Sequence, residues 1–157
     1  MCDFKDVMAR FPTGVTIATT CDEGGSPHGL TVSSFCPVSL DPPLVLVCVA
    51  KSATSYPVFA QTEEFAVSIL RENHAELALR CANSGARKFG GGEFVRTARG
   101  GVVVDNPLAA IECRVDQVHD AGDHIILVGQ VVDQFLSDAG SPAVYFQRQF
   151  AALSSAQ

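Results

Sequence analysis

The sequence lacks the features that define several large classes of protein. Its longest apolar runs, such as residues 44–50, are far shorter than the ~20 residues of a membrane-spanning helix. Basic residues are scarce, because 11 Lys and Arg stand against 17 Asp and Glu and give a net charge of -6. A nucleic-acid-binding domain needs a basic surface that displaces counterions from phosphates. We therefore expect neither a membrane nor a nucleic acid as a partner.

Two further absences indicate where the protein works. Residues 1–6 are charged and contain no apolar segment of a signal peptide, so we expect a cytoplasmic protein. The six cysteines are scattered, with no C-x-x-C pair for zinc or redox chemistry. We expect all six to be reduced, and we expect Cys48 and Cys113, which lie in apolar runs, to be buried thiols.

The common nucleotide-binding and hydrolase motifs are missing as well. No G-x-G-x-x-G is present, because the glycines at 90–92 have neither the spacing nor a preceding strand. Walker A and G-x-S-x-G are also absent. A nucleotide bound by this chain is therefore not held by a Rossmann domain.

The composition fits one globular domain spanning residues 1–157, since 47% of the residues are apolar and 18% are charged. The apolar pattern predicts strands more often than helices, and two long strands joined by a tight turn favour an antiparallel barrel with a few helices. A polar bend at 33–37 and a basic, glycine-rich loop at 83–101 interrupt the pattern. The run at 44–50 predicts burial on both faces. The expected strands are 14–20, 28–32, 38–40, 44–50, 65–70, 102–104, 109–118 and 125–135, and the expected helices are 4–11, 52–60 and 74–82.

A cluster of hydroxyls at Thr31, Ser33, Ser34 and Ser39 is the first candidate site. In an extended segment Thr31 and Ser33 share one face, where their hydroxyls could donate to a flat heterocycle. The alternative is a solvated Ser/Thr turn that caps its own backbone.

A second candidate begins at Lys51, directly after the apolar strand and at the start of a predicted helix. Such a junction offers unpaired N–H groups and the positive end of a helix dipole, which together attract an anion. Ser52, Thr54 and Ser55 add hydroxyl donors. The alternative is that Ser52 or Ser55 is an ordinary N-cap.

A third candidate is Gly122-Asp123-His124, in the turn between the two long strands. His119 and His124 flank this turn, so a hairpin could place their imidazoles opposite one another around a metal. The sequence names no further ligands, however, and we predict no metal site. His124 could instead point into a cleft as a donor or a proton-handling group, or belong to an ordinary turn.

These segments, in this order, resemble the flavin reductase-like family, whose members have the FMN-binding split-barrel fold. The resemblance runs from about residue 4 to residue 150. It rests on FPTGV at 11–15, GLTVSSF at 29–35, VSLDPPL at 38–44, VCVAKS at 47–52, GDH at 122–124 and VGQV at 128–131.

The resemblance implies an antiparallel, Greek-key-like split β-barrel that forms a homodimer with flavin near the interface. It places His124 beside the nicotinamide, as a donor and not as an obligatory catalytic residue. The implied cofactor-binding residues are Gly29, Thr31, Val32, Ser33, Ser34, Cys48, Val49, Ala50, Lys51, Ser52, Thr54, Arg87, Lys88, Phe89 and His124.

The implied activity is that of an NAD(P)H-dependent flavin reductase, which passes hydride from nicotinamide C4 to flavin N5 and supplies reduced flavin to a separate monooxygenase. FMN or FAD, and NADH or NADPH, remain open alternatives. A flavin-binding electron carrier of the same fold is the second hypothesis. A non-enzymatic dimeric barrel is the third.

Overall fold

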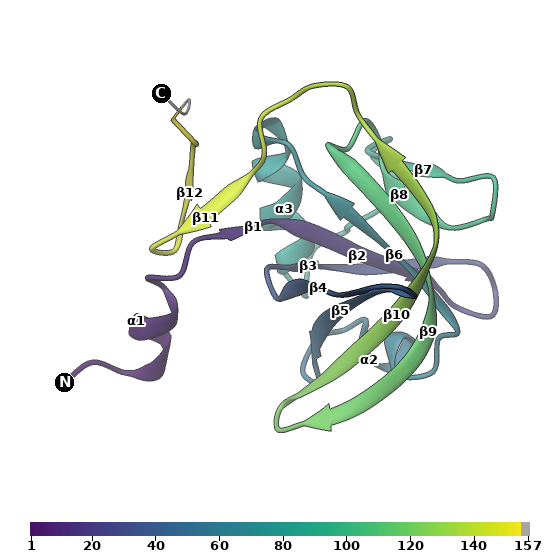
Figure 1. Cartoon of the computed structure of the whole chain (residues 1–157), viewed down its shortest axis with the longest axis horizontal. Coiled ribbons are helices and arrows are strands. Elements are labelled where there is room, and N and C mark those ends of the chain that lie inside the picture. The colour runs from purple at the N-terminus through teal and green to yellow at the C-terminus, as the bar shows by residue number, and fades with distance from the viewer. Residues whose placement is uncertain (155–157) are drawn as a thin grey trace.

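The computed structural model describes residues 1–154. Its centre is a seven-stranded antiparallel sheet in the order β3-β2-β6-β9-β10-β5-β4 (Figure 1). β3, at one edge of this order, also contacts β5 near the other edge, so the sheet curls into a barrel. The strands are β2 (Thr16–Cys21), β3 (Pro27–Val32), β4 (Phe35–Leu40), β5 (Pro43–Ala50), β6 (Glu64–Ile69), β9 (Ala109–Ala121) and β10 (His124–Leu136).

The barrel is filled by one face of these strands. Side chains alternate between the two faces of a strand, and six of the seven strands send apolar residues into a shared core. Phe59, from the short helix α2 (Tyr56–Phe59), joins this core with no exposed surface. The prediction of a mainly β, antiparallel barrel with a few helices is confirmed.

A second layer covers the outside of β2 and β6. It consists of a 3-10 turn (Glu72–His74), α3 (Ala75–Ala82), β7 (Phe94–Arg96) and β8 (Val102–Val104). Leu77 and Cys81 of α3 pack with Ile17 of β2 and Val104 of β8 in a core separate from that of the barrel. β2 and β6 are therefore buried on both faces over most of their lengths.

An arm extends from the barrel on one side (Figure 1). It contains α1 (Phe4–Met8) and a three-stranded sheet of β1 (Thr13–Gly14), β11 (Val144–Phe146) and β12 (Gln149–Ala151), in the order β1-β11-β12. An ion pair of 2.8 Å between Arg148 and Asp6 ties the helix to the β11–β12 turn. No residue of α1 is buried.

Four local predictions need correction. The predicted helix at 52–60 is α2 alone, because turns occupy 51–55 and leave Pro57 in the first turn of the helix. The bend at 33–37 is confined to Ser33 and Ser34, and the loop at 83–101 contains β7. β5 is buried on one face only, since its side chains alternate between buried and half-buried.

No helix of residues 1–154 is both long and apolar enough to span a bilayer.

Candidate active site

The polar bend between β3 and β4 contacts the end of β5. Ser33 and Ser34 are both exposed, and the Ser34 hydroxyl donates a hydrogen bond of 3.3 Å to the carbonyl oxygen of Cys48. The structure thus brings together two predicted cofactor-binding segments that are 14 residues apart in the chain.

Thr31 does not share this exposed position. Its hydroxyl donates a hydrogen bond of 2.6 Å to the carbonyl oxygen of Ala78 in α3, and this bond links the helix to β3. The expectation that Thr31 and Ser33 offer hydroxyls on one open face is therefore wrong, because α3 covers the outer face of β3 at Thr31. Val32 and Val49 point into the barrel core and can offer only backbone atoms to a ligand.

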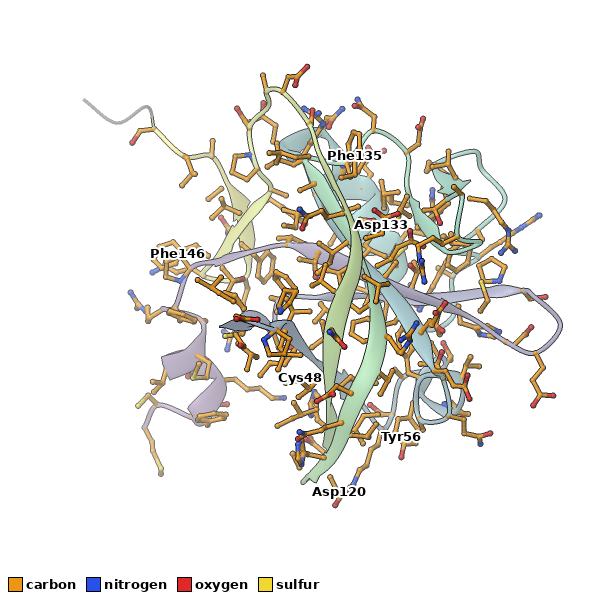
Figure 2. All side chains as sticks on the ribbon, turned by 45° about the vertical axis from the view of Figure 1, so that its right-hand side comes forward. Cys48, Tyr56, Asp120, Asp133, Phe135 and Phe146 are labelled. Atoms are coloured by element: carbon orange, nitrogen blue, oxygen red, sulfur yellow. The ribbon has the colours of Figure 1, made fainter. Side chains whose placement is uncertain are left out.

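Cys48 and Ala50 lie on the opposite face of β5 from the core and are half-buried. Figure 2 labels Cys48 close to the middle of the molecule. The prediction that Cys48 is a fully buried thiol is wrong, whereas that for Cys113 is confirmed. Burial raises the pKa of the Cys113 thiol to about 12.

Lys51 contacts the hairpin between β9 and β10. Its ammonium forms an ion pair with Asp120 and donates a hydrogen bond of 2.8 Å to the carbonyl oxygen of Gly122, while its backbone N–H donates to Asp123 O at 2.8 Å. The hydrogen bond that the Lys51 ammonium donates to the Asp120 carboxylate raises the pKa of Lys51. The prediction of an anion site led by Lys51 at a helix start is not supported, because α2 is only four residues long and begins at Tyr56.

Exposed hydroxyls nevertheless follow Lys51. Ser52 and Thr54 lie on the surface, whereas Ser55 is buried and its hydroxyl has no hydrogen-bond partner among the described residues. The alternative that Ser52 or Ser55 is an ordinary N-cap does not hold either. Ser55 occupies the position before α2, but its side chain makes no capping hydrogen bond.

The Gly122-Asp123 turn positions His124 opposite Ala50 of β5. Gly122 has a φ of +66°, the left-handed conformation that a two-residue hairpin turn requires. His124 Nδ1 donates to the Asp123 carboxylate at 2.6 Å, and this bond lowers the pKa of Asp123. About two-fifths of the His124 side chain is exposed (43%), so its other nitrogen is accessible.

The two histidines of the hairpin do not face one another. His119 is opposite Ile126, and His124 is opposite Ala121. The hypothetical pairing of their imidazoles around a metal is thus wrong. Within residues 1–154 no group of three His, Cys, Asp or Glu side chains could hold a metal ion.

The basic loop lies against β3. The Lys88 ammonium donates to the carbonyl oxygen of Gly29 at 2.8 Å, and the ring of Phe89 lies 3.2 Å from the place where a Cβ on Gly29 would stand. Partial burial lowers the pKa of Lys88. Arg87 folds back over Gly90 and is exposed. Of the three predicted loop residues, Lys88 and Phe89 therefore lie at Gly29, whereas Arg87 lies over Gly90.

Other cations of the loop region have protein partners. Arg80 of α3 pairs with Glu93 at 2.6 Å, and Arg99 pairs with Glu64 at 3.6 Å. Arg96 donates to the carbonyl oxygens of Gly25 and Gly100.

Sequence reasoning missed Asp120 as the partner of Lys51 and Ala78 as the acceptor for Thr31. An acidic residue beside a hairpin turn was visible in the sequence, but its pairing with Lys51 depends on the register between β5 and β10. No sequence signal pointed to Ala78, whose contribution is a backbone carbonyl.

Two hollows of the chain lie away from the bend and the end of β5. One of about 560 Å³ is bordered by β7, β8 and the part of β10 that contains Asp133 and Phe135 (Figure 2). A second, of about 460 Å³, lies beside β2, β6 and Arg99. Neither includes the bend, the end of β5 or His124, whereas a smaller hollow of about 200 Å³ is lined by Arg87, Lys88 and Phe89.

The chain is thus an antiparallel barrel in which the serine bend and the Gly-Asp-His hairpin both contact the end of β5. The chain belongs to the family described as Flavin reductase like domain, which matches residues 8–154.

Known proteins are similar over nearly the whole chain. "Actinorhodin polyketide dimerase" of Streptomyces coelicolor is 56% identical over 97% of this chain and 86% of its own length. "NADH:riboflavin 5'-phosphate oxidoreductase" of Streptomyces pristinaespiralis is 39% identical over 94% of this chain and 85% of its own. "Flavin-dependent monooxygenase, reductase subunit HsaB" of Rhodococcus jostii is 33% identical over 94% and 75%.

A solved structure shows the same fold. The NADH:FAD oxidoreductase SgcE6 of Streptomyces globisporus C-1027, in complex with NAD and FAD fragments, superimposes with a TM-score of 0.89 at 30% identity. The match covers 96% of this chain and 90% of that one. The predicted family and the split-barrel fold are confirmed.

Proposed function

We propose that this chain is a single-domain NADH:flavin oxidoreductase that reduces FMN or FAD and releases the reduced flavin to a separate monooxygenase. The observation that carries the proposal is the pairing of Ala50 with His124, which joins the end of β5 to the Gly-Asp-His hairpin beside the serine bend. The relatives named as NADH oxidoreductases of riboflavin 5'-phosphate and FAD support the same chemistry.

The residues around the bend suit a flavin. Ser33, Ser52 and Thr54 are exposed, and Cys48 and Ala50 on the outer face of β5 are half-buried and could contact a flat ring. Val32 and Val49 would contribute backbone groups only. A bound flavin accepts hydride from nicotinamide at N5, so the protein needs chiefly to bind and orient the two ring systems.

The loop at Gly29 would support the phosphate or adenosine end of the ligand. Lys88 and Phe89 are held in place by Gly29, whereas Arg87 is exposed and can approach an anionic group. A guanidinium suits phosphate because it offers several donors in one plane. We assign Arg87 to phosphate contact and Lys88 to positioning of the loop.

His124 would border the nicotinamide. Because Nδ1–H donates to Asp123, the neutral imidazole presents Nε2 as an acceptor, which suits the amide N–H of a nicotinamide carboxamide. Only the imidazolium could donate from Nε2. The expected donor role thus applies to the protonated ring, and neither form makes His124 an obligatory acid or base.

A homodimer would complete the site. The arm exposes Phe4, Val7, Met8 and Phe11, whose side chains are 46–78% exposed, and β12 is followed by the exposed Leu153. A contiguous apolar surface of this kind marks an interface. The open site in one chain then gains walls from the partner. Phe4→Ser with Phe11→Ser is expected to shift the protein from dimer to monomer in light scattering and to weaken FMN binding.

The cytoplasm is the proposed location. All six cysteines are free, which is typical of proteins in a reducing compartment. NADH is the proposed reductant, and a flavin-dependent monooxygenase is the proposed recipient of reduced flavin, as the name of HsaB suggests for that relative.

Steady-state oxidation of NADH by the purified protein tests the proposal. We expect oxidation only when FMN or FAD is added, and we expect His124→Ala to raise the KM for NADH with little change in FMN affinity. Loss of FMN binding in His124→Ala with unchanged NADH affinity would contradict the role of His124. Flavin binding without NADH oxidation by the unaltered chain would favour an electron carrier, and no flavin binding at all would favour a non-enzymatic barrel.

A second candidate comes from the relative with 56% identity, which is named a polyketide dimerase. On this second proposal, the present chain takes part in joining two polyketide molecules. Turnover of NADH and FMN without any polyketide would show that flavin reduction is an activity of the chain by itself.

A further inference from the structure

The end of β5 is tied to the β9–β10 hairpin through one residue, Lys51. Lys51 contacts three residues of that hairpin, namely the Asp120 carboxylate, the Gly122 carbonyl oxygen and, through its backbone N–H, the Asp123 carbonyl oxygen. Asp120 lies at the tip of the hairpin (Figure 2). Beyond the last ladder pair, between His124 and Ala50, these contacts hold the turn against β5.

The Lys51 ammonium uses two of its donors in this arrangement. It has three N–H donors, of which one faces the Asp120 carboxylate and a second faces the Gly122 carbonyl. About a third of its side chain is exposed (34%), compared with 78% for Asp120. A ligand phosphate would have to compete with both partners for this ammonium.

We propose that Lys51 is a positioning residue for His124 on the nicotinamide side and not a ligand for the flavin phosphate. The inference rests on the proposed function. The Lys51 ammonium holds the Gly122 carbonyl, and the backbone N–H of Lys51 holds the Asp123 carbonyl. Asp123 in turn accepts the Nδ1–H of His124, so the lysine side chain acts on the imidazole through the turn at Gly122. Asp120 acts in the same way through Lys51.

Two matched variants separate this role from phosphate binding. Lys51→Met keeps the length of the side chain and removes its positive charge. Asp120→Asn removes the negative charge of its partner. We expect either variant to raise the KM for NADH by about three- to fivefold, the scale of an exposed ion pair with added hydrogen bonds. The Kd for FMN should change by less than about twofold, because no flavin contact is lost.

Three controls make the result specific. The double variant should be no worse than either single variant, since both remove one interaction. Lys51→Arg should restore most of the NADH affinity. Glu64 of β6 forms an exposed ion pair with Arg99, and Glu64→Gln should leave the affinities for NADH and FMN unchanged.

NMR spectroscopy monitors the conformation of the hairpin independently of enzymatic activity. In ¹H–¹⁵N spectra of the ligand-free protein, Lys51→Met and Asp120→Asn should shift the same signals, those of residues 119–124 and 50–52. A Lys51→Met protein that loses FMN affinity and keeps its NADH KM would overturn the proposal and restore Lys51 as a phosphate ligand. Shifts that differ between the two variants would also overturn it. If the unaltered protein oxidises no NADH with any flavin, the proposed function fails, while the spectra still decide whether Lys51 orders the hairpin.

Discussion

The Lys88 ammonium donates a hydrogen bond of 2.8 Å to the carbonyl oxygen of Gly29 and so attaches the basic loop to β3. Lys88→Met removes this bond and releases residues 87–89. We expect the Kd for FMN to rise by about three- to tenfold, as for the loss of one charge-assisted hydrogen bond. Titration of flavin fluorescence measures this change. Arg114→Met, at an exposed position of β9, is the control and should bind FMN normally.

Gly29 cannot accept a side chain without rearrangement. A Cβ at this position would stand 2.9 Å from the carbonyl oxygen of Ala18 and 3.2 Å from the ring of Phe89. Gly29→Ala is therefore expected to lower the free energy of unfolding by about 1–3 kcal/mol, the usual cost of overpacking. Urea unfolding measures the change. Gly85→Ala, with its nearest neighbour at 3.6 Å, should differ little from the unaltered protein.

Much of the barrel could be predicted from the sequence because its strands carry strong local signals. The β-branched run at Thr16 and the long apolar runs of β5 and β10 matched their observed positions within a few residues. α3 and its preceding 3-10 turn also lie where helical spacing placed them. These elements bury a continuous face, so the apolar pattern alone reports them.

The parts that could not be predicted depend on contacts between distant segments. Thr31 looked like a free hydroxyl until α3 was placed across β3, and Lys51 looked like a free cation until the register of β5 with β10 brought it to Asp120. Burial of β5 was overestimated because the run is uniformly apolar, while its outer face is covered only in part. Residue propensities and local motifs do not predict such contacts between segments that are far apart in the sequence.

The cysteines should differ sharply in their reaction with a thiol reagent. Cys2 and Cys36 are exposed, whereas Cys81 and Cys113 are buried and burial raises the pKa of both. Since the thiolate is the reactive form, a pKa of about 12 leaves roughly one thiolate in 10⁴ at pH 8. Mass spectrometry after brief alkylation at this pH should find Cys2 and Cys36 modified and Cys113 unmodified. Early modification of Cys113 in the folded protein would refute its placement in the core.

Acid should destabilise the turn between β2 and β3. The hydrogen bond from His28, at 2.9 Å, lowers the pKa of the Asp22 carboxyl below its usual value of 3.8. A carboxyl whose pKa is lowered by folding stabilises the native state above its unfolded pKa and loses that contribution as pH falls through the folded value. Melting temperatures should fall as the pH drops below about 4, and less steeply in Asp22→Asn. Equal slopes for the two proteins would show that this pair contributes nothing to acid stability.

A single-turnover reaction without oxygen tests the central claim most directly. The protein is mixed with FMN and NADH, and the absorbance of oxidised flavin and of NADH is followed together. We predict that both decrease at the same rate, one NADH per flavin, and that His124→Ala requires more NADH to reach that rate. If FMN binds and its absorbance stays constant while NADH persists, this chain does not transfer hydride from nicotinamide to flavin.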